Sequence, residues 1–243
     1  MNDFTLIGGP TAFFTHAGLR WMTDPAFSPP GDYEYLTKLT GPAVEADAVG
    51  DIDVVLLSHD HHADNLDPAG REFLPRAGRV LTTGAGAERL GGNAIGLEPW
   101  ASVEIESPDG STVTVTAVPA QHGPDGTDEI TGPVIGFVLQ APGAETVYVS
   151  GDNASLDVVR HIAERVGGID IAVLFAGGGA DRPALRRRLS HAFQRPGGRG
   201  GEDPGRAPGH PRALRRVGAL HPGRRRAARR LCRQSGHRRA ADA

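Results

Sequence analysis

A continuous apolar run, residues 54–57 (VVLL), leads directly into the segment SHDHHADNLD, which holds three histidines and three aspartates within ten positions. An apolar run without alternation is typical of a strand that is buried on both faces, as in the parallel sheets of α/β proteins. In such sheets the loops at the carboxyl ends of the strands usually carry the functional site. This feature therefore predicts an α/β fold with a polar site at the end of a buried strand.

Other β-type runs recur up to about residue 175, separated by Gly, Pro and short polar turns. We predict strands at residues 4–8, 11–18, 19–25, 51–58, 79–83, 101–107, 111–120, 133–140, 145–152 and 169–177. Helices are predicted at residues 66–78 and 155–167. The second helix begins after Asn153 or Ser155 as the N-cap, and its apolar face is formed by Leu156, Val159, Ile162, Ala163 and Val166. This order of strands and intervening helices predicts a layered α/β domain.

The regular pattern stops after Gly179. Residues 181–243 contain 18 arginines and only 4 acidic residues, and their sequence has a period of neither 2 nor 3.6. A composition so rich in Arg, Gly and Pro predicts a disordered or weakly structured segment. We therefore expect a domain at residues 1–178 and an aperiodic tail at residues 179–243.

The charge is divided just as unevenly as the pattern. Residues 1–180 hold 25 acidic and 8 basic residues, a net charge of −17. This charge argues against nucleic acid or an anionic membrane as a partner of the domain. Cys232 is the only cysteine, which excludes an intrachain disulfide framework, and no apolar run approaches the length of a transmembrane helix. We expect a cytoplasmic protein that does not insert into a membrane.

Ligand-type side chains follow three of the predicted strands. The first strand end supplies a group of four within one short loop: His59, His61, His62 and Asp64. Two later β runs end in His122 and in Asp152. Imidazole and carboxylate groups are the ligands that zinc and similar divalent ions prefer. A solvated polar loop is the alternative, but three strand ends that supply such ligands in order favour a metal site.

Five segments, GGPTAFF, LRWMTDPAF, LLSHDHHADNLD, VPAQHGP and YVSGD, resemble the metallo-β-lactamase-fold hydrolases, most closely the branch that contains the ascorbate-6-phosphate lactonase type of protein. The resemblance covers residues 4 to about 178. It implies a four-layer αββα sandwich, incomplete here at the C-terminus, with one or two metal ions (Zn²⁺ or Mn²⁺) between the sheet edges. The hallmark of that family is H-x-H-x-D-H, followed by a third histidine, a bridging aspartate and a last histidine near the C-terminus.

This sequence departs from the hallmark in its first motif. Counting back from Asp64 gives D-x-H-x-D-N, whereas counting forward from His59 gives H-x-H with one extra residue before Asp64. The register stays open, so that one or both of His61 and His62 are expected as ligands. The resemblance implies that His59 and His122 complete the first metal site, that Asp152 bridges, and that Asp64 binds a second metal or holds the attacking water. Because Asn65 stands where the hallmark has histidine, the number of ions also stays open.

The remaining candidates are expected to have no role as ligands. His16 lies in a predicted strand, His161 on the surface of a predicted helix, and four others in the tail: His191, His210, His221 and His237. Asp24, in TDP, is expected to be a turn residue, although the resemblance places it near the cleft.

The tail has a further interpretation. Residues 187–223 can be back-translated with allowed codons so that reading one base later gives a capped helix pattern, a β run and a strand that ends in histidine. This is what the family has near its C-terminus, so we interpret the Arg-rich tail as the product of a frameshift.

The resemblance implies a metal-dependent hydrolase that uses a metal-activated water on an ester, a lactone or a phosphoester of a small molecule. Two alternatives remain: an inactive truncated remnant of such an enzyme, and, less favoured, a nucleic-acid-binding protein that acts through the Arg-rich tail.

Overall fold

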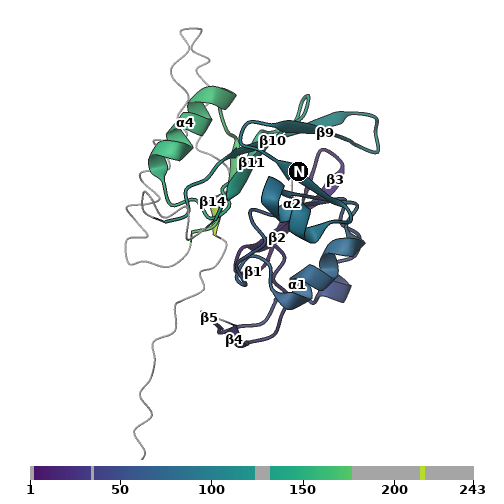
Figure 1. Ribbon diagram of the computed structural model, residues 1–243. Helices are drawn as coiled ribbons and strands as arrows, with labels where there is room; N and C mark the ends of the chain where they lie inside the picture. Colours follow the sequence, from purple (N-terminus) through teal and green to yellow (C-terminus); the bar gives the residue numbers. More distant parts are fainter. Residues whose placement is uncertain (1–2, 34–35, 124–131, 177–213, 217–243) are drawn as a thin grey trace, which may run out of the picture.

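Two six-stranded β-sheets form the centre of the protein in the computed structural model, which describes residues 3–33, 36–123, 132–176 and 214–216. One hydrophobic cluster lies between the sheets, and one lies on the outer side of each sheet. Helices cover these outer sides (Figure 1). The order of layers is helix, sheet, sheet, helix, which confirms the predicted αββα sandwich.

The first sheet has the strand order β1-β2-β3-β6-β7-β8. Neighbours from β1 to β3 pair antiparallel, and β3, β6, β7 and β8 run parallel. The bounds are β1 Phe4–Gly8, β2 Thr11–His16, β3 Leu19–Thr23, β6 Val54–Leu56, β7 Arg79–Thr83 and β8 Ala94–Leu97. Because β3 and β6 are parallel neighbours, the segments that follow them begin at the same edge of the sheet.

The second sheet has the order β14-β13-β12-β11-β10-β9. Strands β9 to β12 pair antiparallel, and β12, β13 and β14 run parallel. The bounds are β9 Ser102–Glu106, β10 Thr112–Pro119, β11 Ile135–Gln140, β12 Val147–Val149, β13 Ile171–Leu174 and β14 Leu214–Arg216.

Strand β6 shows how the apolar run is used. Val54 and Leu56 belong to the cluster between the sheets, whereas Val55 belongs to the outer cluster of the first sheet. All three residues are almost completely buried. The absence of alternation in the sequence therefore reflects burial on both faces.

Helices α1 Pro68–Phe73 and α4 Leu156–Val166 confirm the two predicted helices. The short 3₁₀ helix η2 Leu74–Arg76 continues α1, and Phe73 packs into the outer cluster of the first sheet. Ser155 is the N-cap of α4, since its side chain accepts the Val158 N–H. None of the described helices is long and apolar enough to cross a membrane.

Several short elements were not predicted. They are the 3₁₀ helix η1 Ala46–Ala48, the hairpin β4 Gly31–Tyr33 and β5 Leu36–Lys38, helix α2 Gly84–Leu90, and strand β8. Strand β14, of three residues, lies in the tail, for which a disordered or weakly structured segment was predicted. It pairs in parallel with β13 through backbone groups, and such pairing does not require a periodic side-chain pattern.

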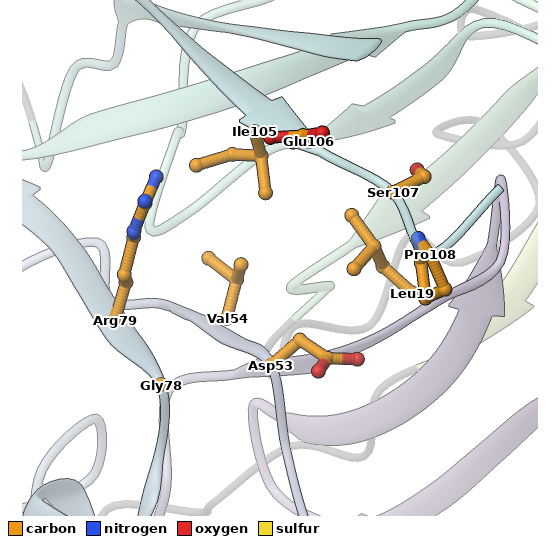
Figure 2. A pocket seen from close by; sticks show the side chains of 9 residues that line it. All are labelled: Leu19, Asp53, Val54, Gly78, Arg79, Ile105, Glu106, Ser107 and Pro108. Carbon is orange, nitrogen blue, oxygen red and sulfur yellow. The ribbon is translucent and has the colours of Figure 1, made fainter. Parts of the chain in front are cut away.

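A cavity of about 540 Å³ lies at one end of the sandwich. Figure 2 shows the side chains that line it. Its lining includes Leu19, Val54 and Arg79, at the starts of β3, β6 and β7, and Ile105 near the end of β9. The histidine-rich loop follows the carboxyl end of β6. It therefore lies at the opposite end of this strand from the cavity.

Candidate metal centre

The loop after β6 forms the centre of the candidate site. Leu57 extends the sheet by donating its N–H to the Leu81 carbonyl at 2.9 Å, and His59 follows in a fully buried position. Asp24, directly after β3, reaches the same edge, because its N–H donates to the Leu56 carbonyl at 3.2 Å. The parallel pairing of β3 and β6 thus places Asp24 beside the histidine-rich loop.

The second sheet adds two side chains at this end. His122 follows β10, and Asp152 follows β12. The start of β11 is joined to the loop, since Ile135 donates its N–H to the Ser58 carbonyl at 3.2 Å. Gly151 permits this close approach: it has φ +55°, and a Cβ there would lie 2.5 Å from the Ile135 carbonyl oxygen.

Five of the six predicted ligands lie together. The ligand atoms of His59, His122 and Asp152 are all within 4.8 Å of one another, and so are those of His59, His61 and His62. His59 Nε2 lies 2.9 Å from His62 Nδ1, and His122 Nε2 lies 3.3 Å from Asp152 Oδ2. The His62 and His122 rings are 5.1 Å apart. His59 therefore belongs to both groups and connects them.

Burial keeps two of these histidines neutral. It lowers the pKa of His59 to about 3, against the opposing charge of Asp152. Burial, together with the neighbouring histidines, lowers the pKa of His62 to about 4. A neutral imidazole keeps a lone pair on one ring nitrogen, which is the form that binds a metal.

Asp152, in contrast to these two neutral histidines, carries a charge. Burial alone would raise the pKa of Asp152, but the hydrogen bond from His122 holds it below its usual value. The same hydrogen bond raises the pKa of His122. The neutral imidazoles of His59 and His62 and the ionised carboxylate of Asp152 form a donor set that fits a divalent cation.

Asp24 turns the backbone, as predicted, with φ +24°, but it is more than a turn residue. Its carboxyl group is fully buried and accepts the Ser58 N–H at 2.6 Å, the Ser58 hydroxyl at 2.5 Å and the Asn65 amide at 2.7 Å. Burial raises the pKa of Asp24 to about 8, against these three hydrogen bonds. The Ser58 hydroxyl also lies 2.9 Å from His59 Nδ1. Asp24 thus supports His59 through Ser58, as outer partners commonly orient metal-binding histidines.

Asp60, which one register of the hallmark includes, joins neither ligand group within the described part of the chain. Its carboxylate accepts Arg89 Nε at 2.9 Å and Arg89 Nη2 at 2.5 Å. Arg71 Nη2 donates to the Asp60 carbonyl at 3.0 Å. Because Arg89 belongs to α2 and Arg71 to α1, Asp60 anchors the loop to both helices.

Asp64 and His61 are half-buried in the same loop. After the hydrogen bond that His122 donates to Asp152, the charge of Asp64 also contributes to the raised pKa of His122. Asp64 is absent from both ligand groups found among the described residues, so its role stays a prediction. A Cβ at Gly132 would lie 2.5 Å from His61 Nε2, which shows that the Gly132 backbone covers that edge of the ring.

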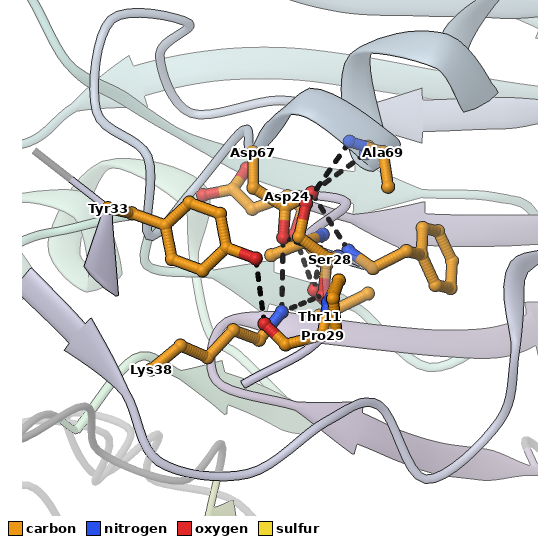
Figure 3. Close-up of polar contacts among 11 residues, drawn as sticks. Thr11, Asp24, Ser28, Pro29, Tyr33, Lys38, Asp67 and Ala69 are labelled. Atoms are coloured by element: carbon orange, nitrogen blue, oxygen red, sulfur yellow. Dashed lines mark hydrogen bonds and ion pairs between the residues drawn. The ribbon is translucent and has the colours of Figure 1, made fainter. Parts of the chain in front are cut away.

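A second hydrogen-bond network, around Asp67, holds the end of the histidine-rich loop (Figure 3). The Asp67 carboxylate accepts the Ser28 N–H at 2.7 Å and Lys38 Nζ at 3.0 Å. Thr11 donates its hydroxyl to the Asp24 carbonyl at 2.7 Å. These bonds hold the start of the segment between β3 and β4 against β2, and its later part against the N-cap of α1.

The histidines expected to have no role as ligands lie apart from the two groups where the structure describes them. His16 ends β2 and is fully buried, and His161 is exposed on α4. Four others lie outside the described residues: His191, His210, His221 and His237.

Comparison with known sequences gives one family match and two curated relatives. A model of the beta-lactamase superfamily domain matches residues 20–197. The N-acyl-phosphatidylethanolamine-hydrolyzing phospholipase D 1 of Caenorhabditis elegans is 25% identical over 188 residues, which are 70% of this chain and 52% of that protein. A UPF0173 metal-dependent hydrolase of Methanocorpusculum labreanum is 33% identical over 140 residues, which are 56% of this chain and 60% of that protein. The chain thus matches little more than half the length of these relatives.

Solved structures share the fold. An isothiocyanate hydrolase from Delia radicum gut bacteria superposes with a TM-score of 0.64 at 20% identity, over 79% of this chain and 81% of that one. A metallo hydrolase from the archaeon Ignicoccus hospitalis superposes with a TM-score of 0.55 at 16% identity, over 79% and 92%.

Proposed function

The chain belongs to the beta-lactamase superfamily of metal-dependent hydrolases, and from this premise we propose that its histidine cluster holds the divalent metal ion used for hydrolysis. The observation that carries the proposal is the convergence of His59, His122 and Asp152 from two different sheets. A divalent ion supplies a bound water whose pKa is lowered to roughly 7, and it polarises the bond to be cleaved.

We propose His62 rather than His61 as the further histidine ligand. The His62 ring contacts both the His59 ring and the His122 ring, at 4.7 and 5.1 Å between centroids. His61 contacts His59 and His62, and the Gly132 backbone covers its Nε2 edge. The first motif of this chain is then H-x-x-H, which places Asp64 two residues after the second histidine.

An ester, a lactone or a phosphoester of a small molecule is the proposed substrate. One relative is named as a phospholipase D that hydrolyses N-acyl-phosphatidylethanolamine, and the other as a metal-dependent hydrolase. All three bonds suit a metal-activated water, and the fold does not choose among them. The sequence motifs support the finer proposal of an ascorbate-6-phosphate lactonase-like enzyme that uses Zn²⁺ or Mn²⁺.

The frameshift interpretation also remains a proposal. Residues 181–243 would then contribute nothing selected for the site, and the last histidine of the family hallmark would be encoded in the shifted frame. Sequencing the genomic DNA around codons 176–190 tests this directly. A protein expressed from the restored frame should bind metal more tightly than the present chain, and equal affinity would contradict the proposal.

Metal binding and hydrolysis are tested together with one ligand variant and one control. Protein stripped by a chelator is reloaded with Zn²⁺ or Mn²⁺ and assayed on p-nitrophenyl acetate, a simple lactone and bis(p-nitrophenyl) phosphate. His122→Ala should weaken metal binding at least ~100-fold, since loss of an outer partner alone costs about 10–100-fold. His161→Ala, an exposed histidine on α4, should leave metal binding unchanged.

The outcomes separate the alternatives. Metal retained without hydrolysis of any substrate would indicate an inactive remnant. Salt-dependent binding to DNA without metal would support the basic tail as the functional part. Equal metal content in the two histidine variants would refute the proposed ligand set.

A further inference from the structure

Asn65 lies between two carboxylates at the back of the metal centre. It is 1% exposed, and its Nδ2 lies 2.7 Å from Asp24 Oδ2 and 3.1 Å from Asp152 Oδ1. An amide nitrogen donates hydrogen bonds and has no lone pair to offer a metal. The opposite orientation of the amide would set its oxygen against the ionised Asp152 carboxylate, so this neighbour fixes the nitrogen in its position.

The two oxygens of Asp152 consequently have different surroundings. Oδ2 lies 3.3 Å from His122 Nε2, on the side of the histidine cluster. Oδ1 accepts the Asn65 amide. A cation placed against Oδ1 would meet the positive end of the amide dipole instead of a ligand atom.

Both carboxyl oxygens of Asp24 are engaged by hydrogen-bond donors of the protein. Its Oδ1 accepts the Ser58 N–H, and its Oδ2 accepts both the Ser58 hydroxyl and the Asn65 amide. Both ligand groups found among the described residues contain His59, and neither contains Asp24. The space between Asp24 and Asp152 Oδ1 is therefore occupied by hydrogen-bond donors of the protein.

We propose that the centre holds a single divalent ion, on the histidine side of Asp152, and that the Asn65 amide takes the place of a second ion by holding Asp24 and Asp152 together. This inference rests on the proposed metal function and specifies its stoichiometry. It leaves Asp64 the role of holding the attacking water rather than that of a ligand to a second metal.

Metal counting tests the stoichiometry without any activity measurement. The full-length protein is stripped with a chelator, dialysed against micromolar Zn²⁺ and analysed for metal per chain. A second sample loaded with Mn²⁺ is examined by electron paramagnetic resonance. We expect one ion per chain and the spectrum of isolated Mn²⁺, without the splitting that a magnetically coupled pair produces.

Asn65→Asp tests the role of the amide. This nearly isosteric change replaces the amide donor with a carboxyl group beside the ionised Asp152 carboxylate, and two like charges so close together favour the uptake of a cation. We expect the variant to retain a second ion per chain. Asn93→Asp is the matched control, because Asn93 also donates its amide to two buried acceptors, the Leu74 and Ala77 carbonyls, and should leave the count at one.

The outcomes separate failure of the single-ion inference from failure of the proposed metal function. Two ions per chain, or a coupled Mn²⁺ spectrum, in the unmodified protein would overturn the single-ion inference and leave the proposed function standing. No bound ion would overturn both. If Asn65→Asp folds and still binds one ion, the amide is not what excludes the second. If this variant does not fold, the count and the spectrum of the unmodified protein still decide the stoichiometry.

Discussion

The anchor between Asp60 and Arg89 gives a prediction whose size follows from the structure. The Asp60 side chain is 2% exposed and accepts two hydrogen bonds from Arg89, whose own side chain is 49% exposed. Arg89→Met keeps the aliphatic stem of the side chain but removes both donors. Breaking a fully buried ion pair costs about 3–5 kcal/mol. Because water reaches Arg89 and Arg71 remains 4.0 Å from Asp60, we expect about 2 kcal/mol here.

Urea unfolding at neutral pH, with a chelator present to remove any contribution of bound metal, measures this cost. The matched control is Arg160→Met, since Arg160 is 51% exposed and pairs with Asp157, which is 88% exposed. We expect the control to change the free energy of unfolding by less than about 0.5 kcal/mol. Equal effects of the two substitutions would show that the Asp60 contact is no stronger than a surface pair.

A second substitution identifies the cause. In an Asp60→Asn background no buried charge is stranded, so Arg89→Met should cost about 1 kcal/mol less than in the unmodified protein. The pH dependence gives an independent check. Burial would raise the pKa of Asp60, but the Arg89 bonds outweigh it and lower the pKa below 3.8. The stabilisation is therefore present above pH 3.8 and is lost as the pH falls through the lower, folded-state pKa, where the difference between the unmodified protein and Arg89→Met should shrink.

Three further predictions concern stability. Burial lowers the pKa of His16 below 6.5, and neither ring nitrogen has a partner among the described residues, so only the unfolded state takes up its proton just below pH 6.5. The unmodified protein should lose up to ~1.4 kcal/mol per pH unit there, and His16→Leu should lose less, as urea unfolding at pH 7.5 and 5.5 would show. Gly70→Ala would place a Cβ 1.8 Å from the Pro25 carbonyl oxygen, and a cost under ~1 kcal/mol would contradict this geometry. Phe137→Ala should cost about 3–5 kcal/mol in the same assay, because the ring is fully buried between the sheets.

The sequence predicted the fold well where side-chain periodicity reflects burial. Residues 54–57 predicted a strand covered on both faces, and their side chains do pack into the clusters on both sides of the first sheet. The apolar face of α4 buries Val159 and Ile162 as expected. The sequence did not predict elements whose formation depends on backbone capping and tertiary packing. In α2 (GAGAERL) there is no apolar stripe, and the helix depends on the Thr83 cap and on packing against β8.

The meeting of the candidate ligands was predictable from the sequence, but the hydrogen bonds that support them were not. Ligand-type residues after β6, β10 and β12 were visible because each ends a recognisable strand. The bonds of Asp24 to Ser58 and Asn65 were not visible, because they depend on β3 being the parallel neighbour of β6, a pairing between segments about thirty positions apart. A polar residue directly after β3 was the only local sign of this role.

Each sheet is built from one continuous half of the chain: the first from residues 4–97, and the second from 102–174 with 214–216. During synthesis the first sheet can therefore complete its pairing before the second has left the ribosome. Until then the inner faces of Phe14, Trp21 and Leu56 have no cover, and such a half-made protein is a natural client for chaperones. His59 follows a strand of the first sheet and Asp152 a strand of the second. The two side chains therefore come together only when the two sheets dock. Metal uptake would then be the last event in the maturation of the protein, and a reporter of its completion.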